Sequence, residues 1–406
     1  MLSKKYRDSP KNRDVISLFS GAMGLDIGLS QAGLNVKIGQ DMDGDCVATM
    51  KANSHGVFVG DIRGISPEQL LGATGLSPAE PFLVCGGPPC QPFSTAGKRM
   101  GIDDPRGSLF TDFIRMIDHI RPRFFIMENV RGLMSASVKN LAEEASQRML
   151  FGTAKVKKND KGHVLEIVLS EFEKLGYKTT YGILDSVNYG VPQFRERFVL
   201  LGSRDGEDIF LPFPTHFQTH QDSAYQWVTL KTAIADLENK EGECTYFSQE
   251  RLDFLRMVPE GGNWRDLPLD SVEKAMGGAY KSGGGKVGFF RRLSYSQPSP
   301  TLVTSPVQKA SMLCHPKKDR PLSVREYARI QQFPDDWVFC GNIASKYRQI
   351  GNAVPIGLAR ALGKAIVSVA EGMATVKTKR VRGTDIHSRI KNAIEMGICN
   401  ASQYRV

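Results

Sequence analysis

Short apolar runs alternate with longer segments of helical periodicity from residue 14 to residue 132. The runs lie at 14–19, 36–40, 82–87 and 123–129, and each has the length of a strand. Their apolar residues are nearly continuous, which is typical of strands that are buried on both faces. Strands that alternate with helices form a parallel sheet. We therefore predict an α/β fold in which helices cover both faces of a parallel sheet.

The pattern resumes at 164–201, after a polar stretch at about 135–162 that we interpret as an exposed insertion. After residue 205 the sequence is rich in glycine, proline and aromatic residues and has no sustained periodicity. We expect a second, irregular and mostly-β domain there. The predicted units are a first domain at 1–205, a second domain at 206–340, a helix that returns to the first domain at 341–372 and a basic tail at 373–406.

The charge balance favours a polyanionic partner. The formal net charge is +10, and lysine and arginine side chains that replace phosphate counterions supply much of the affinity for nucleic acid. No apolar run reaches the roughly 20 residues of a membrane-spanning helix, and no secretory signal is evident, so we expect a cytoplasmic protein. The seven cysteines form no CxxC pair. This pattern indicates neither a zinc site nor a disulfide framework.

A glycine-rich turn follows the first predicted strand. In FSGAMGLDIG (19–28), Gly21 and Gly24 lie where the strand turns into a helix, a place at which the backbone can approach a ligand. Such a turn also occurs without any ligand or with a dinucleotide, but the third glycine of the dinucleotide motif is not at its usual spacing. Asp41 and Asp61 end the next two strands and are placed to bind a ribose and an adenine. We predict a nucleoside cofactor.

Cys90 lies in a loop that follows a buried strand. Pro88 and Pro89 fix the backbone before it, and this is how a nucleophile is presented at the carboxyl edge of a parallel sheet. The next strand ends in MENV, which places Glu128 and Asn129 at the same edge. Basic residues of the loop can lower the pKa of the thiol.

A thiolate and a partly neutral carboxyl group match one reaction. Carbon 5 of a pyrimidine is a poor nucleophile until a thiolate adds to C6, and this addition is easier when N3 is protonated as it occurs. A buried carboxyl group can retain the necessary proton. Cys90 and Glu128 together therefore indicate methylation at carbon 5.

Four motifs in order, FSGAMG, GGPPCQPFS, MENV and QIGNAVP, resemble those of DNA cytosine-5 methyltransferases of the bacterial or phage restriction-modification type. The resemblance extends from residue 14 to about residue 370. It implies a Rossmann-like, S-adenosylmethionine-dependent methyltransferase sheet, mostly parallel with one antiparallel edge. It also implies that residues 1–205 are the catalytic and cofactor-binding domain and residues 206–340 the target-recognition domain.

The resemblance assigns roles residue by residue. It implies that Cys90 is the nucleophile and that Glu128 contacts N3. It also implies that Arg195 and Arg197 hold the target base and the active-site carboxylate, and it leaves open which arginine does which. Asp41 and Met42 stand where many relatives have glutamate and an aromatic residue. The positions implied for S-adenosylmethionine are Phe19, Gly21, Gly24, Asp41, Met42, Asp61, Ile62, Pro89, Leu109 and Asn352.

The chemistry requires a cytosine that is flipped out of double-stranded DNA. The expected DNA-binding residues are Gln91, Ser94, Lys98, Arg99, Arg106, Arg291 and Arg292. Further basic candidates in the second domain are Arg251, Arg256, Arg265, Lys281 and Lys286. A transfer-RNA cytosine-5 methyltransferase and a catalytically silent DNA-binding relative remain as alternatives. We expect a monomer that associates with the nucleoid by binding DNA, with a cognate restriction endonuclease as a possible partner.

Overall fold

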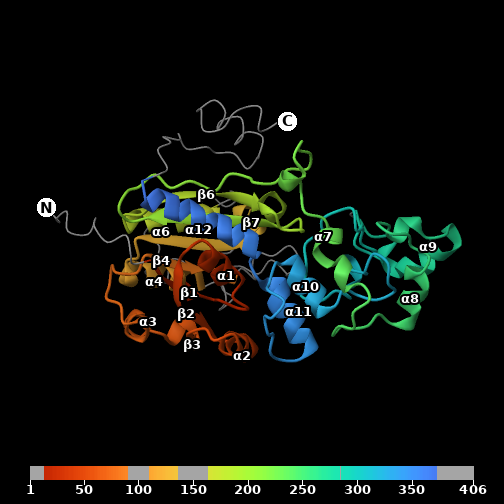
Figure 1. Ribbon diagram of the computed structural model, residues 1–406, viewed down its shortest axis with the longest axis horizontal. Helices are drawn as coiled ribbons and strands as arrows, with labels where there is room; N and C mark the ends of the chain where they lie inside the picture. Colours follow the sequence, from red (N-terminus) through yellow and green to blue (C-terminus); the bar gives the residue numbers. More distant parts are fainter. Residues whose placement is uncertain (1–12, 90–108, 136–162, 284, 373–406) are drawn as a thin grey trace.

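The computed structural model describes residues 13–89, 109–135, 163–283 and 285–372. These residues form two lobes (Figure 1), and one of them is built on a single sheet. The sheet contains seven strands in the order β3-β2-β1-β4-β5-β7-β6. The strands are β1 (Asp14–Leu18), β2 (Asn35–Asp41), β3 (Val57–Val59), β4 (Leu83–Gly86), β5 (Phe124–Val130), β6 (Lys178–Asp185) and β7 (Glu196–Ser203).

The sheet confirms the predicted α/β fold and refines one detail of it. Strand β7 is antiparallel to both of its neighbours, β5 and β6, whereas the other pairs are parallel. The antiparallel strand was expected at the edge, but β6 lies outside it. The connection between β6 and β7 spans only residues 186–195, which is too short for a parallel crossover. Strand β7 therefore returns antiparallel, between β5 and β6.

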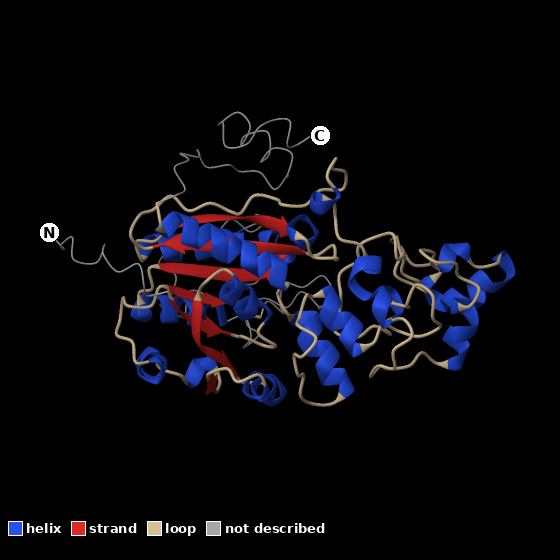
Figure 2. Cartoon of the chain, viewed as in Figure 1, coloured by secondary structure: helices blue, strands red, loops and turns tan. Residues whose placement is uncertain are grey.

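Helices cover both faces of the sheet (Figure 2). Along β5, Phe125 and Met127 join the core beneath α3, α4 and α6, whereas Phe124 and Ile126 join the core beneath α1 and α12. Phe125 stacks on Phe172 of α6 with ring centroids 4.2 Å apart. This explains why the first four residues of the strand, at 124–127, are all apolar. The helices of this lobe are α1 (Gly24–Gln31), α2 (Gly44–Ala52), α3 (Pro67–Thr74), α4 (Leu109–Ile120), α6 (His163–Lys174) and α12 (Ile356–Ala370).

The second lobe differs from the mostly-β domain expected there. Its described residues form isolated bridges, such as Arg292–Cys314, but no strand of the kind seen in the first lobe. Glycines and prolines, as in PEGGNW (259–264), interrupt the chain before a ladder can extend. Phe254, Met276 and Phe290 gather around short helices instead. The helices are α7 (Leu230–Ile234), α8 (Gln249–Leu255), α9 (Leu269–Met276), α10 (Val324–Ile330) and α11 (Ile343–Asn352).

Helices α11 and α12 connect the two lobes. Residues 343–370 are long and apolar enough to cross a membrane, but 61% of their most apolar window is buried inside the protein. Ile350 of α11 shares a core with Met50 of α2, and Leu358 of α12 lies in the core beneath the sheet. The burial of this segment is that of core helices in a globular protein.

Two glycines of α1 allow α12 to approach closely. A Cβ atom on Gly24 would lie 2.3 Å from the carbonyl oxygen of Val354, and one on Gly28 would lie 2.4 Å from the Cβ of Ala359. Both distances are shorter than van der Waals contact. Glycine at these two positions therefore sets the distance between the helices.

We predict that Gly28→Ala lowers the free energy of unfolding by about 1–3 kcal/mol, because the added methyl group overpacks the contact with α12. The matched control is Gly72→Ala in α3, where an added Cβ meets nothing within 4 Å. That change should be neutral or stabilise the fold by up to about 1 kcal/mol. Urea unfolding of the two variants measures the difference. Equal effects would contradict the packing argument.

Candidate functional site

The loops that follow the parallel strands meet at one edge of the sheet. The turn after β1 carries Phe19 and Gly21, and their backbone φ angles are +55° and +54°. The amide of Gly21 donates to Oδ2 of Asp41 at 2.8 Å, so the loops after β1 and β2 are tied together. A Cβ on Gly21 would meet no atom within 4 Å. The turn therefore has an open face with a carboxylate beside it.

The sequence analysis did not identify Gln40, a buried amide that joins three of these loops. Its Oε1 accepts a hydrogen bond from the amide of Phe19 at 3.2 Å, and its Nε2 donates to the carbonyl oxygen of Gly60 at 2.7 Å. The available signal was a glutamine directly before Asp41, at the carboxyl end of β2. Burial raises the pKa of the neighbouring Asp41, although the backbone amides of Asp43 and Gly21 oppose this effect.

The loop after β3 has its own internal order. Asp61 accepts hydrogen bonds from the backbone and the side chain of Arg63, and the side-chain bond lowers the pKa of Asp61. Ile62 is buried, whereas the side chain of Met42, which follows β2, is 63% exposed. An exposed apolar side chain at this edge is available to pack against a planar ligand.

Arg115 of α4 is a second residue that the sequence analysis missed. Its guanidinium donates to the carbonyl oxygens of Ile62 at 2.7 Å and Ile65 at 3.0 Å, and it pairs with Asp112 at 3.1 Å. These bonds fix the backbone of the loop after β3. An arginine on the polar side of a helix gives no sequence signal that it will reach two carbonyl groups.

The other predicted cofactor positions lie on separate elements. Leu109 is the first residue of α4 and is half-buried, Asn352 ends α11 and is exposed, and Pro89 is exposed after β4. Gly24 faces Val354 at the start of the α12 contact instead of the open face of the turn. The structure therefore gives Gly24 a packing role.

Asn129 links the ends of β4 and β5. Its side-chain amide donates to the carbonyl oxygen of Pro88 at 2.8 Å, two residues before Cys90. The predicted nucleophile and the predicted DNA contacts of its loop lie outside the described residues; these are Cys90, Gln91, Ser94, Lys98, Arg99 and Arg106. The hydrogen bond from Asn129 therefore holds Pro88, and with it the segment that leads to Cys90, next to the end of β5 that carries Glu128.

Glu128 forms a buried ion pair at this edge. Oε1 of Glu128 lies 2.7 Å from Nε of Arg197, and about a tenth of each side chain is exposed. Burial raises the pKa of Glu128, and the positive charges of Arg197 and Arg195 only partly oppose it. A Cβ on Gly87 would lie 3.0 Å from Oε2. The glycine before the two prolines therefore leaves room for the carboxyl group.

Arg195 is the largest fully buried side chain of the described residues. Its two terminal nitrogens donate to the carbonyl oxygens of Leu302 at 2.8 Å and Gly351 at 2.5 Å, and its Nε has no partner among the described residues. Burial lowers its pKa, as does the like charge of Arg197. Of the two arginines, Arg197 contacts the carboxylate and Arg195 joins the sheet to the second lobe.

The predicted DNA contacts of the second lobe have different surroundings. Arg292 is 6% exposed and donates to the carbonyl oxygens of Leu255 and Val258 and to the carboxylate of Asp319. These bonds occupy the guanidinium within the lobe, so a base contact would require breaking them. Arg291 is half-buried, with its Nε on the carbonyl oxygen of Met312. Local partners also hold Arg251, Arg256, Arg265 and Lys286.

The edge thus combines an open glycine turn with a carboxylate, a buried carboxyl group of raised pKa and a strand that leads to a cysteine. The family model for C-5 cytosine-specific DNA methylases matches residues 13–150 and 154–368. The Type II methyltransferase M.PspPI of Psychrobacter sp. is 37% identical over 88% of this chain and 79% of its own length. The Type II methyltransferase M.Sau96I of Staphylococcus aureus is 39% identical over 88% of this chain and 76% of its own length.

Solved structures share the fold at lower identity. An Escherichia coli prophage protein described as a DNA modification methyltransferase superposes with a TM-score of 0.61 at 23% identity, over 88% of this chain and 99% of that one. The methyltransferase EhMeth of Entamoeba histolytica superposes with a TM-score of 0.53 at 16% identity, over 87% of this chain and 97% of that one. These likenesses support the fold alone.

We predict that Arg197→Met lowers the free energy of unfolding at neutral pH by up to about 3–5 kcal/mol, because it leaves the Glu128 charge buried without its partner. The deficit should shrink as the pH falls, since protonation of Glu128 removes that charge. The control is Arg131→Met, which removes an exposed pair with Glu196 and should cost at most about 1 kcal/mol. Unfolding titrations across pH measure both. A deficit independent of pH would contradict the assignment.

Proposed function

The chain belongs to the family of C-5 cytosine-specific DNA methylases, and on that premise we propose that it methylates cytosine through a covalent bond between Cys90 and C6. It is a DNA cytosine-5 methyltransferase that uses S-adenosylmethionine. The proposal concerns which residues act and how. The observation that carries it is the buried Glu128–Arg197 pair at the same edge as the strand that leads to Cys90.

The residues at the edge fit a nucleoside cofactor. Gly21 leaves open space where a side chain would stand, and Asp41 beside it retains acceptor capacity for ribose hydroxyl groups. Met42 offers an exposed apolar surface, and Arg115 fixes the loop that carries Asp61 and Ile62. We assign the cofactor site to these residues together with Asn352. S-adenosylmethionine, when bound, supplies the methyl group.

The substrate steps follow from the two reactive groups. The thiolate of Cys90 adds to C6, the S–C6 bond forms, and the ring electron pair is taken up at N3, which receives the proton of Glu128. The resulting enamine makes C5 nucleophilic, and C5 is the atom that is methylated. Loss of the C5 proton to a base then restores the double bond as the S–C6 bond breaks and the thiolate leaves, and N3 returns its proton to Glu128.

Arg197 orients the carboxyl group for this task. The ion pair fixes Oε1 of Glu128, while burial keeps the pKa of the group raised. A carboxyl group with a raised pKa retains a proton closer to neutral pH, as proton donation to N3 requires. Removing the target base from the DNA stack is part of the proposal, because a thiolate cannot reach C6 within a duplex.

The setting of the enzyme is also proposed. The relatives are named Type II methyltransferases, and a Type II system pairs such an enzyme with an endonuclease of the same specificity. We infer that this protein acts as a monomer in the bacterial cytosol and protects DNA from such a nuclease. Genomic DNA that remains sensitive to every nuclease specific for the methylated sequence would contradict this role.

Cys90→Ser should lower methyl transfer to duplex DNA on the order of a thousandfold or more, because a hydroxyl group is a far weaker nucleophile than a thiolate. DNA affinity should remain within about threefold of wild type, since the substitution changes a single atom. The matched control, Cys244→Ser in the second lobe, should retain activity. Transfer of a labelled methyl group to DNA and to transfer RNA measures the reaction. Activity in Cys90→Ser, or on RNA alone, would contradict the proposal.

Glu128→Gln should lower the rate of a single turnover about 10²–10⁴-fold, because glutamine cannot give a proton to N3. The rate ratio of wild type to variant should be largest at low pH and should decrease as the pH rises through the raised pKa of Glu128. The control is Glu196→Gln, an exposed carboxylate near the same edge, which should leave the rate unchanged. A ratio that does not vary with pH would contradict proton donation by Glu128.

A further inference from the structure

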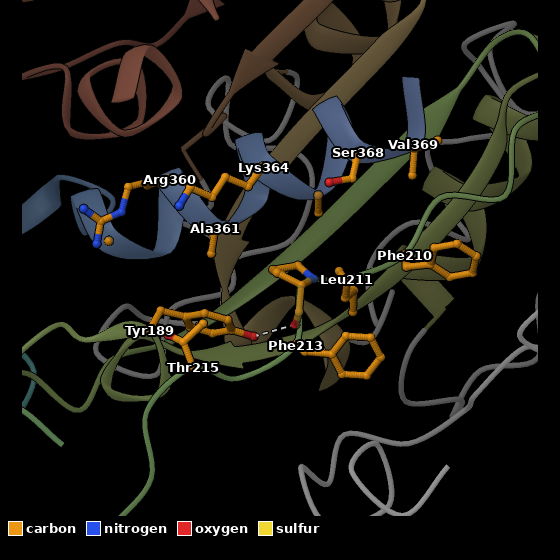
Figure 3. A pocket seen from close by; sticks show the side chains of 13 residues that line it. Tyr189, Phe210, Leu211, Phe213, Thr215, Arg360, Ala361, Lys364, Ser368 and Val369 are labelled. Carbon is orange, nitrogen blue, oxygen red and sulfur yellow. Dashed lines mark hydrogen bonds between the residues drawn. The ribbon is translucent and has the colours of Figure 1, made fainter. Parts of the chain in front are cut away.

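A cavity of about 490 Å³ lies between helix α12 and the segment that follows β7 (Figure 3). One wall is formed by Phe210, Leu211 and Phe213, and the other by Gly357, Ala361 and Ala365 of α12. The hydroxyl of Tyr189 donates to the carbonyl oxygen of Pro212 at 2.9 Å and fixes the first wall. None of the residues assigned to cofactor or cytosine lines this cavity, so it is separate from the site already described.

The helix wall has the shape of a groove. Gly357, Ala361 and Ala365 follow one another at intervals of four, so these small side chains lie on one face of α12. Facing them are large apolar side chains of the opposite wall. At Gly357 an added Cβ would lie 2.5 Å from Oε1 of Gln332, so that end of the row is already filled. Ala361 and Ala365 leave room opposite the aromatic wall for the bulky apolar side chains of another segment. The cavity therefore suits a ligand with a continuous apolar edge.

Two positive charges border the groove. Arg360 and Lys364, one turn apart on α12, both line it, as Figure 3 shows. No carboxylate of the described residues forms an ion pair with either of them.

The sequence beyond α12 contains a segment with a continuous apolar edge. Residues 373–406 lie outside the described residues, and within them isoleucine recurs at positions 386, 390, 394 and 398. Residues spaced by four share one face of an α-helix. The family match ends at residue 368, so this segment is additional to the shared domain.

We propose that residues 386–398 of this chain bind as a helix in the groove between α12 and the segment 209–215. The lengths agree, because positions 357–369 and 386–398 each span about 18 Å at 1.5 Å per residue. The linker is also long enough for residues 386–398 to reach the groove. Residues 373–385 extend up to about 45 Å when stretched, and Val369 already lines the cavity. The isoleucines fill the groove.

A photoreactive side chain in the full-length protein tests this contact. Ile390 is replaced by benzoylphenylalanine, the protein is irradiated at low concentration, and the attachment point is mapped by mass spectrometry. The expected result is a link within one chain to Phe210, Phe213 or the groove face of α12. The control carries the same group at Ser388, which lies on the opposite side of the predicted helix. It should give the groove link at a yield at least about fivefold lower.

Filling the groove supplies the second test. Ala365→Arg places a long charged side chain where the isoleucines would lie, so the link from position 390 should fall about tenfold or more. DNA methylation by this variant reports that it is folded, because Ala365 has no part in the catalytic site. Three results would overturn the proposal: links between two chains, which would make a second copy the occupant, links elsewhere in the same chain, or links unaffected by Ala365→Arg in an active enzyme.

Discussion

The guanidinium of Arg195 holds three parts of the molecule together. It lies at the start of the antiparallel strand β7, and its hydrogen bonds reach Leu302 in the second lobe and Gly351 at the end of α11. Gly351 precedes Asn352, a predicted cofactor residue, and Arg195 is two positions from Arg197, which contacts Glu128. The loss of either carbonyl acceptor would leave a further donor of this buried cation without a partner, in addition to Nε, so the three parts depend on one another.

Every second residue from Gln193 to Arg197 takes part in this network of buried side chains. Gln193, two residues before Arg195, is fully buried; its Nε2 donates to Gln331 at 3.1 Å and its Oε1 accepts from the amide of Leu302 at 2.8 Å. Gln331 in turn donates to the carbonyl oxygen of Ile350 at 2.8 Å. Gln193, Arg195 and Arg197, spaced two positions apart, thus join the second lobe, α11 and the active-site carboxyl group. This network fixes the lobes around the catalytic edge.

The fold of the first lobe could be predicted because its strands are buried on both faces. Phe125 and Phe124 lie in opposite cores, so the first half of β5 is a continuous apolar run that is easily recognised. The motifs also led us to expect that either Arg195 or Arg197 holds the active-site carboxyl group, and the structure pairs Arg197 with Glu128. The second lobe could not be predicted in this way, because its short segments form isolated bridges and lack a period. The contacts of Arg292 and Arg115 could not be predicted either. Each arginine donates to backbone carbonyl groups far away in the sequence, and no sequence pattern marks these pairs.

The most direct measurement of the central claim is covalent trapping. The protein is incubated with S-adenosylmethionine and duplex DNA that contains 5-fluorocytosine in random contexts. Fluorine at C5 prevents the final elimination, so an enzyme that attacks C6 remains bonded to its target. The account predicts an adduct that survives denaturation and maps to Cys90, with the recognised sequence in the trapped DNA. Methylation of ordinary cytosine without any such adduct, or an adduct at another residue, would contradict it.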